Sequence, residues 1–193
     1  MDQASIALTS FINKYCKVSG EELQAVIQAF TFSAVNAQSV ILRSGQTCNL
    51  FSINLQGAFR SYTVDKGGNE TTTWLIFEQM PVIEPTSFLL QRRSDYTIQA
   101  LEDSLLASIT YDALQQLYDK IPAFQVFGRK LMEQLLLLSM CRVDFLLLET
   151  PQERYERLLK STNFMQRVPL KYLASYIDVT PSTLSRLRRK VKS

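Results

Sequence analysis

The sequence predicts an α+β fold, in which a small antiparallel β-sandwich or barrel with flanking helices precedes a long helix and a C-terminal helix-turn-helix. Three observations lead to this prediction. Short strand-like segments separated by turns fill residues 32–110. An uninterrupted helical pattern then begins at Pro122. Finally, the excess of basic side chains is confined to residues 152–193.

Two short helices are expected before the strands. Ser5–Tyr15 has apolar residues at helical spacing, and Ser19-Gly-Glu-Glu22 places a capping serine three residues before a glutamate. In the strand region, Asp65-Lys-Gly-Gly-Asn69 is the clearest hairpin turn, because glycine accepts the positive φ that tight hairpins need. The flanking runs that alternate apolar and polar residues are Ser39–Leu42, Leu50–Leu55, Ala58–Val64 and Thr71–Phe77.

The helix that begins at Pro122 is expected to continue to Thr150-Pro151, which is about 42 Å at 1.5 Å per residue. Its apolar side chains form two stripes. The first contains Phe127, Leu131, Leu138, Cys141, Phe145 and Leu148, and the second contains Met132, Leu136, Met140, Val143 and Leu147. One stripe can cover the chain's own β domain, so the other predicts a coiled-coil-like homodimer. The alternative is a helix buried on both sides within one chain.

The last part of the chain predicts a helix-turn-helix. After a helix over Gln152–Lys160 and a connecting segment over Ser161–Val168, one apolar helix face contains Leu170, Leu173, Ala174 and Ile177. A break at Asp178-Val179 precedes Thr180, an N-cap, and Pro181, a residue suited to a first helical turn. The second helix is expected to bury Leu184, Leu187 and Val191 and to expose Ser182, Thr183, Ser185, Arg186, Arg188 and Arg189.

The charge of the chain is unevenly distributed. Residues 1–151 contain 11 Lys and Arg against 15 Asp and Glu, whereas residues 152–193 contain 10 against 3. Such a basic tail indicates a polyanion, either nucleic acid or an anionic membrane surface. DNA is favoured, because Ser182, Thr183 and Ser185 widen the polar face and the apolar face has no Trp or Phe.

Composition argues against an enzyme and against a cofactor. The chain has no histidine, which excludes Ser–His or Cys–His nucleophiles and His-ligated zinc or haem. Its cysteines, Cys16, Cys48 and Cys141, are too far apart for a Cys-x-x-Cys site, so no metal is expected. Glu78, Glu84 and Glu102 have no spacing that links them as an acid/base pair. Without a secretory signal or an apolar run of 18 residues, a soluble, cytoplasmic protein is expected.

The order of β-rich domain, pairing helix and helix-turn-helix resembles the Crp/Fnr superfamily of bacterial transcription regulators. Gly45, Gly57, the Asp65–Asn69 hairpin and the stretch Glu84–Glu102 match its β-roll. The tail matches more sharply, through Glu153-Arg-Tyr155, Val168–Ala174 and Thr180–Arg186. The resemblance implies a jelly-roll-like, cyclic-nucleotide-binding-like β-roll sensor at 1–121, a dimerisation helix at 122–150 and a DNA-binding domain at 151–193.

The resemblance also implies partners and contact residues. The partners are a second copy of the chain, double-stranded DNA with a near-palindromic site, and RNA polymerase. Thr180 matches a phosphate contact, whereas Pro181, Ser182 and Arg186 match positions that face base edges, with Arg186 reading guanine. The DNA-contact residues we predict are Lys171, Thr180, Pro181, Ser182, Thr183, Ser185, Arg186, Arg188 and Arg189.

The sequence departs from the family pattern in three places. Asp178 stands where the helix-turn-helix usually has glycine, and the chain ends before the usual β wing. In the phosphate cassette, Ile83 replaces the glycine before Glu84, and Ser94-Asp95 occupies the usual Arg-Ser or Arg-Thr position. Because an acidic side chain there would repel a cyclic phosphate, we predict an effector pocket with Glu84 and Ser94 that does not bind cyclic AMP. The alternative is a cyclic-nucleotide-binding regulatory module.

Overall fold

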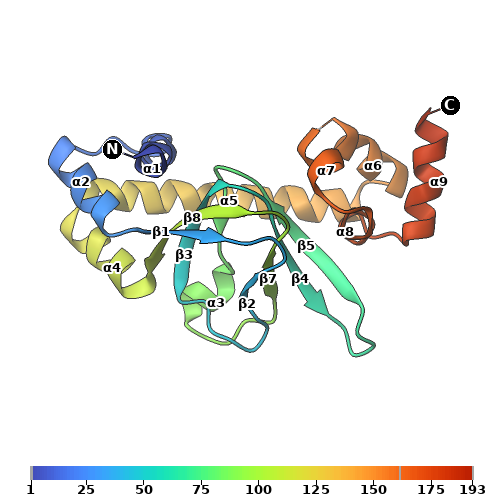
Figure 1. Cartoon of the computed structure of the whole chain (residues 1–193), viewed down its shortest axis with the longest axis horizontal. Helices are drawn as coiled ribbons and strands as arrows, with labels where there is room; N and C mark the ends of the chain where they lie inside the picture. Colours follow the sequence, from blue (N-terminus) through green and yellow to red (C-terminus); the bar gives the residue numbers. More distant parts are fainter. Residues whose placement is uncertain (1, 161, 193) are drawn as a thin grey trace.

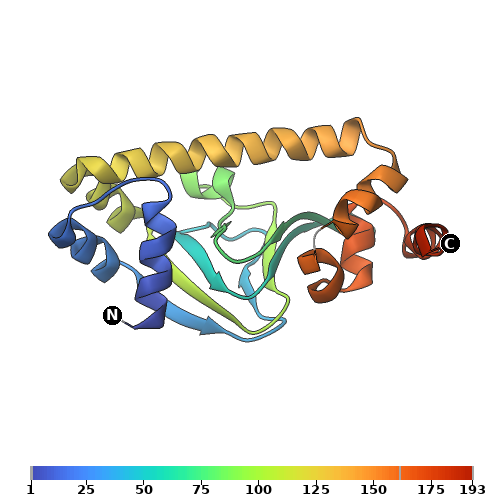
Figure 2. The same cartoon turned by 90° about the horizontal axis from the view of Figure 1, so that it is seen from above.

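The computed structural model describes the backbone of residues 2–160 and 162–192, and the side chains of these residues except 162–164, 191 and 192. A β-roll occupies the middle of the molecule (Figure 1). The N-terminal helices and α4 lie at one end of the roll, and the C-terminal helices lie at the other end. Helix α5 (Pro122–Leu147) runs along the roll and connects the two ends (Figure 2).

The roll consists of two four-stranded antiparallel sheets, with strand orders β1-β8-β3-β6 and β2-β7-β4-β5. Its strands are β1 (Thr31–Val35), β2 (Val40–Leu42), β3 (Leu50–Gln56), β4 (Phe59–Val64), β5 (Glu70–Ile76), β6 (Pro81–Val82), β7 (Thr97–Ala100) and β8 (Ser104–Thr110). The predicted antiparallel β domain is therefore confirmed. Ile53 of the first sheet and Phe59 and Ile98 of the second are fully or almost fully buried in the core between them.

The predicted hairpin joins β4 to β5. The Asp65 carboxylate accepts hydrogen bonds from the backbone N–H groups of Gly67 at 2.8 Å and Asn69 at 2.9 Å, and Gly68 has φ +84°. Glycine is equally necessary at position 57, where φ is +106° and an added Cβ would lie 2.0 Å from the hydroxyl oxygen of Ser104.

Four short helices flank the roll: α1 (Gln3–Asn13), α2 (Gly20–Gln28), α3 (Pro85–Leu90) and α4 (Tyr111–Lys120). The predicted cap of α2 is confirmed, because the Ser19 hydroxyl accepts from the Glu22 N–H and the Glu22 carboxylate accepts from the Ser19 N–H. Helix α1 packs on the start of α5, where the Phe11 and Phe127 ring centroids are 6.0 Å apart.

Helix α5 buries the first predicted stripe in part. Phe127, Leu131 and Phe145 are buried, but Cys141 and Leu148 are exposed, which corrects the prediction for those two positions. Leu148 follows the last residue of the helix and so lies beyond the surface that the helix covers.

The second stripe of α5 faces away from the roll. Its exposed members are Leu136 at 62%, Met140 at 58%, Val143 at 52% and Leu147 at 77%, whereas Met132 is half-buried. Figure 2 shows why, since α5 forms one long edge of the molecule and meets the roll on one side only. Among the described helices, none is long and apolar enough to span a membrane.

Four helices follow α5: α6 (Pro151–Leu159), α7 (Thr162–Arg167), α8 (Leu170–Tyr176) and α9 (Pro181–Lys192). The segment that we expected to be a connection over Ser161–Val168 is therefore mostly helical. The six residues of α7 are too few to show a helical apolar period, and the last residue of α7, Arg167, is held by Glu78 and Glu102 of the roll. Tertiary contacts, which outweigh local propensity, explain this difference.

The C-terminal helices share a hydrophobic core with the roll. Phe77 and Leu101 of the roll lie in the same buried cluster as Phe145, Leu173 and Leu184. The DNA-binding domain that the sequence predicts is thus packed directly against the sensor domain.

Candidate nucleic-acid interface

Helices α8 and α9 form a helix-turn-helix. Leu173, Ala174 and Ile177 of α8 are fully or almost fully buried, as is Leu184 of α9. Leu170 is 45% exposed, which corrects its predicted place on the inner face, and Tyr172 is buried instead. Val191, the third predicted inner residue of α9, lies outside the described side chains.

The turn between the two helices depends on Asp178. This residue has φ +56°, a left-handed conformation that aspartate tolerates better than most residues. The turn is closed by the Val179 N–H, which donates to the Ala174 carbonyl at 3.0 Å. Asp178 thus does what the glycine of the usual pattern would do.

Thr180 caps α9 as predicted, since its hydroxyl accepts from the Thr183 N–H at 3.2 Å. Pro181 is the first helical residue and lacks an N–H, so it leaves no donor unsatisfied there. One side of α9 is then polar and open to solvent. Its exposed residues are Thr180, Pro181, Ser182, Ser185, Arg186 and Arg189, whereas Thr183 and Arg188 are half-buried.

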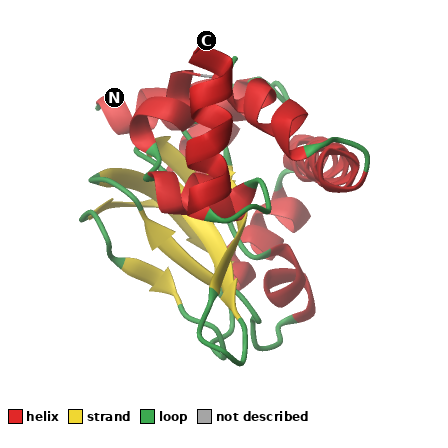
Figure 3. Ribbon diagram, turned by 90° about the vertical axis from the view of Figure 1, so that its right-hand side faces the viewer, coloured by secondary structure: helices red, strands yellow, loops and turns green. Residues whose placement is uncertain are grey.

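The arginines of this face have no acidic partner in the described part of the chain. Arg186 donates to the hydroxyl of Thr183 at 3.1 Å, and neither it nor Arg188 nor Arg189 forms an ion pair with a described residue. Their positive charge is therefore available to an external anion. Figure 3 shows α9, the helix that ends at the C label, in front of the other helices at this end of the molecule.

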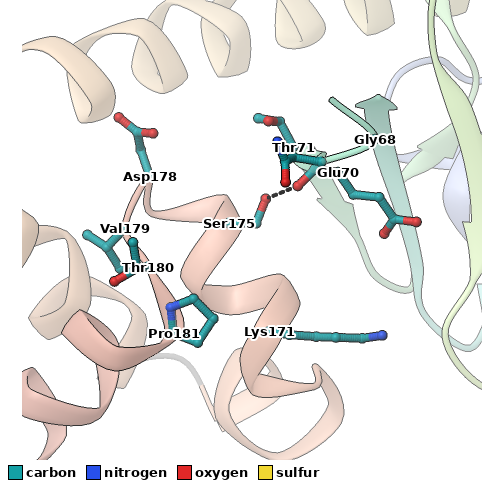
Figure 4. Close-up of a pocket in the computed structure, with 10 residues that line it drawn as sticks. Gly68, Glu70, Thr71, Lys171, Ser175, Asp178, Val179, Thr180 and Pro181 are labelled. Carbon is teal, nitrogen blue, oxygen red and sulfur yellow. Dashed lines mark hydrogen bonds between the residues drawn. The ribbon is translucent and has the colours of Figure 1, made fainter. Parts of the chain in front are cut away.

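A polar hollow of about 600 Å³ separates the start of α9 from the β4–β5 hairpin (Figure 4). Gly68, Glu70 and Thr71 line it from the hairpin. The exposed Lys171 of α8 lines it from the other side, together with Thr180 and Pro181. The hollow is therefore lined by three of the predicted DNA-contact residues, Lys171, Thr180 and Pro181.

A second cavity, of about 260 Å³, lies between the roll and α5. Its lining residues are Ser61, Thr73, Trp74, Ile83, Glu84, Pro85, Thr86, Tyr96 and Ser139, and none of these described residues is Lys or Arg. Glu84 is buried and caps α3, because its carboxylate accepts from the N–H groups of Thr86 at 3.2 Å and Ser87 at 2.6 Å.

Ser94, the other predicted pocket residue, is not among the residues that line this cavity. Its hydroxyl donates to the Tyr96 carbonyl and accepts from the Tyr96 N–H, both at 3.0 Å. Glu84 therefore lines the cavity, whereas Ser94 stabilises a turn through its hydrogen bonds to the Tyr96 backbone.

Comparison with known proteins agrees with this architecture. Residues 33–120 match the family model of the cyclic nucleotide-binding domain. FixK2 from Bradyrhizobium japonicum superimposes with a TM-score of 0.69 at 16% identity, covering 84% of each chain. A protein from Eubacterium rectale assigned to the Crp/Fnr family superimposes with a TM-score of 0.71 at 14% identity, covering 91% of this chain and 84% of that one.

The chain has the Crp/Fnr fold. The catabolite activator protein of Thermus thermophilus shares it at a TM-score of 0.57 and 18% identity, over 91% of this chain and 84% of that one. No curated protein sequence matches the chain significantly.

Sequence reasoning missed one group of residues within this Crp/Fnr fold. Three arginines link the roll to the C-terminal helices through their side-chain contacts. They are Arg60, Arg142 and Arg167. They are 25 or more positions apart in the sequence. No local pattern connects them, so only the folded structure identifies them as one group.

Proposed function

We propose that the protein is a homodimeric, sequence-specific DNA-binding transcription regulator of Crp/Fnr type. The observation that carries this proposal is the solvent-facing side of α9, where Arg186 and Arg189 are exposed without an acidic partner among the described residues. A basic recognition helix held by a buried inner face is what a helix-turn-helix presents to the major groove.

Some of the proposed contact residues of α8 and α9 bind the DNA backbone, and others bind the bases. Thr180 caps the start of α9, and Lys171 of α8 lines the same hollow, so a hydroxyl, an ammonium and the helix N-terminus favour a DNA phosphate at this hollow. We expect Arg186 to read guanine with its planar guanidinium. The proposed contact residues remain Lys171, Thr180, Pro181, Ser182, Thr183, Ser185, Arg186, Arg188 and Arg189, of which Thr183 and Arg188 are half-buried.

The proposed dimer uses the exposed stripe of α5. Leu136, Met140, Val143 and Leu147 are each more than half exposed in the single chain, which is unusual for a contiguous apolar surface of a monomer. A parallel pair of α5 helices would bring both C-terminal domains to the same end of the dimer. The two α9 helices could then enter successive major grooves about 34 Å apart.

The effector cavity is proposed not to bind cyclic AMP. A cyclic phosphate needs a cationic partner, and the described lining has a carboxylate, Glu84, but no Lys or Arg. The alternative function, a cyclic-nucleotide-binding regulatory module, is favoured by the family match of residues 33–120. Titration calorimetry with cyclic AMP and cyclic GMP distinguishes the two, since micromolar binding of either nucleotide would support the alternative.

The proposed regulator has three parts along the chain. We divide the chain into a sensor domain at 1–121, a dimerisation helix at 122–150 and a DNA-binding domain at 151–193, because α5 begins at Pro122 and α6 at Pro151. A regulator of this kind acts in the cytoplasm, is no enzyme and has RNA polymerase as its further partner.

Selection of bound duplexes from random DNA tests the DNA-binding proposal. We expect a near-palindrome whose half-sites lie about 10 base pairs apart, centre to centre, or a multiple of that distance. The logarithm of the binding constant should fall linearly with the logarithm of salt concentration, by about 0.9 for each phosphate neutralised. Failure to enrich any duplex, or binding that salt does not weaken, would contradict the proposal.

A further inference from the structure

The roll and the helix-turn-helix are joined by three arginines, Arg60, Arg142 and Arg167, which we name the arginine latch. We propose that the latch fixes the position of α9 relative to the roll and thereby sets the spacing of the two DNA half-sites. This inference rests on the proposed function. The three arginines are positioning residues, because the described residues that they contact belong to the roll, α5 and α8 and not to the exposed face of α9.

Arg167 ties the end of α7 to two loops of the roll. Its guanidinium donates to Glu78 at 2.6 and 2.8 Å and to Glu102, with one bond to Glu102 at 3.1 Å. Glu78 precedes β6 and Glu102 lies between β7 and β8. A guanidinium that forks between two carboxylates fixes direction as well as distance, which a single ammonium cannot do.

Arg60 holds α8 from inside the second sheet. It is 2% exposed and lies 2.7 Å from the Glu70 carboxylate. Its guanidinium carbon lies 3.9 Å from the ring centroid of Tyr62 on β4 and 3.6 Å from that of Tyr172 on α8. A buried cation in contact with aromatic rings from both domains favours one arrangement of the two.

Helix α8 also satisfies the free edge of the same sheet. Strand β5 is the outer strand, and the Ser175 hydroxyl accepts from the Thr72 N–H at 2.8 Å. The same hydroxyl donates to the Glu70 carbonyl at 3.1 Å (Figure 4). Edge groups left without a partner would be costly when buried, so α8 replaces a neighbouring strand here.

Arg142 completes the latch from α5. It donates to the Thr73 carbonyl of β5 at 3.2 Å and to the Tyr176 carbonyl of α8 at 2.7 Å. A cation at the C-terminus of α8 also interacts favourably with the helix dipole. The side chain of Arg142 therefore connects the proposed dimerisation helix α5 to the edge strand β5 and to α8 of the helix-turn-helix.

The position of the helix-turn-helix determines which half-site spacing the dimer can bind. Only residues 148–150 separate α5 from α6, so the angle of the helix-turn-helix about this connection depends on its contacts with the roll. The shared hydrophobic core holds the two together, and the directional contacts of the latch select one angle. A shift of one base pair moves a half-site by about 3.4 Å and rotates it by about 35°. A dimer whose recognition helices are held rigidly should reject such a shift, and a dimer with a released latch should tolerate it.

The test measures spacing separately from base preference. Selected half-sites are placed at a series of centre-to-centre spacings that differ by one base pair, and binding is measured for the full-length wild type and for Arg167→Gln. We expect the wild type to prefer one spacing by about tenfold over its neighbours. For Arg167→Gln we expect a preference of less than about threefold, with the base preference inside each half-site unchanged.

Matched variants complete the experiment. Glu78→Gln combined with Glu102→Gln should broaden the spacing in the same way, whereas Arg43→Gln removes an exposed arginine that follows β2 and should leave the spacing preference unchanged. If Arg167→Gln does not fold, the double glutamine variant and Ser175→Ala give the same test.

The two proposals can fail separately. If the wild type binds no duplex, the proposed function is wrong. If the wild type binds with one preferred spacing and the folded latch variants keep that preference, the latch inference alone is wrong.

Discussion

At the residue scale, Arg186 combines two properties that a base-reading side chain needs. It is exposed, and its hydrogen bond to the Thr183 hydroxyl, at 3.1 Å, comes from the same helix. An arginine supported by a neighbour loses less freedom when it binds than a free one does. The bond also leaves other guanidinium donors free for the O6 and N7 acceptors of guanine.

Replacing Arg186 by alanine should therefore relax specificity at one base of each half-site. The expected cost is about 1–3 kcal/mol of discrimination at that base, because a bidentate contact is lost. Selection of bound duplexes by wild type and variant measures it. Arg43→Ala, which removes the same charge from an exposed position after β2, is the control. An unchanged base preference in Arg186→Ala would exclude the reading role.

Residue-scale prediction from the sequence works where the cause is local. The caps at Ser19 and Thr180 and the break between helices at Asp178 depend on residues within three or four positions, and the structure has all three. Arg60 and Tyr172 could not be paired in this way. They are 112 positions apart, and their contact exists only after the sheet and α8 have formed.

At the element scale, α7 shows how a helix without a local signal is held. Its terminal Arg167 is bound by Glu78 and Glu102, and the neighbouring Val168 is buried. The sequence predicted a connection, since apolar periodicity is the main helical signal and the six residues of α7 are too few to show it. By contrast, α5 and the β4–β5 hairpin were predictable, because a long uninterrupted pattern and a glycine turn are local features.

The ion pairs of α7 also predict an acid response. Hydrogen bonds from Arg167 lower the pKa of Glu78 from 4.5 to about 2. The unfolded chain therefore binds more protons than the folded one between these pH values, and stability falls as pH falls from about 4.5 toward 2. The stabilisation from this pair is fully present above the unfolded pKa.

Urea unfolding at a series of pH values in this range measures the effect. Trp74 is the only tryptophan and lies on β5 beside Thr73, which Arg142 contacts, so its fluorescence reports this region. In Arg167→Gln the loss of stability on acidification should be smaller, because the pKa of Glu78 returns toward its usual value. The same acid dependence in Arg167→Gln and in the Arg43→Gln control would contradict this role of the pair.

At the scale of the whole molecule, the proposed function requires a particular placement of the dimer surface on α5 and the DNA-binding surface on α9. Dimerisation through α5 has to bring both copies of α9 to one side of the dimer. The exposed stripe of α5 runs toward the C-terminal domain, and α9 lies at that end of the molecule (Figures 1 and 2). A dimer built on the stripe therefore presents two copies of α9 on one side. The sequence indicated both surfaces separately, but the latch that relates them depends on contacts between distant residues.

The stripe yields the last prediction. Leu136 and Met140 are 62% and 58% exposed in the single chain, so Leu136→Glu with Met140→Glu should leave the monomer folded. In a dimer the new carboxylates would be buried together, which is strongly unfavourable. Light scattering after gel filtration should show a mass near 22.1 kDa for this variant and about twice that for the wild type. Leu90→Glu, which changes an equally exposed leucine (62%) on α3, should remain dimeric. The variant with the lower mass should also bind the palindromic duplex more weakly. A double variant that stays dimeric would show that α5 does not form the interface.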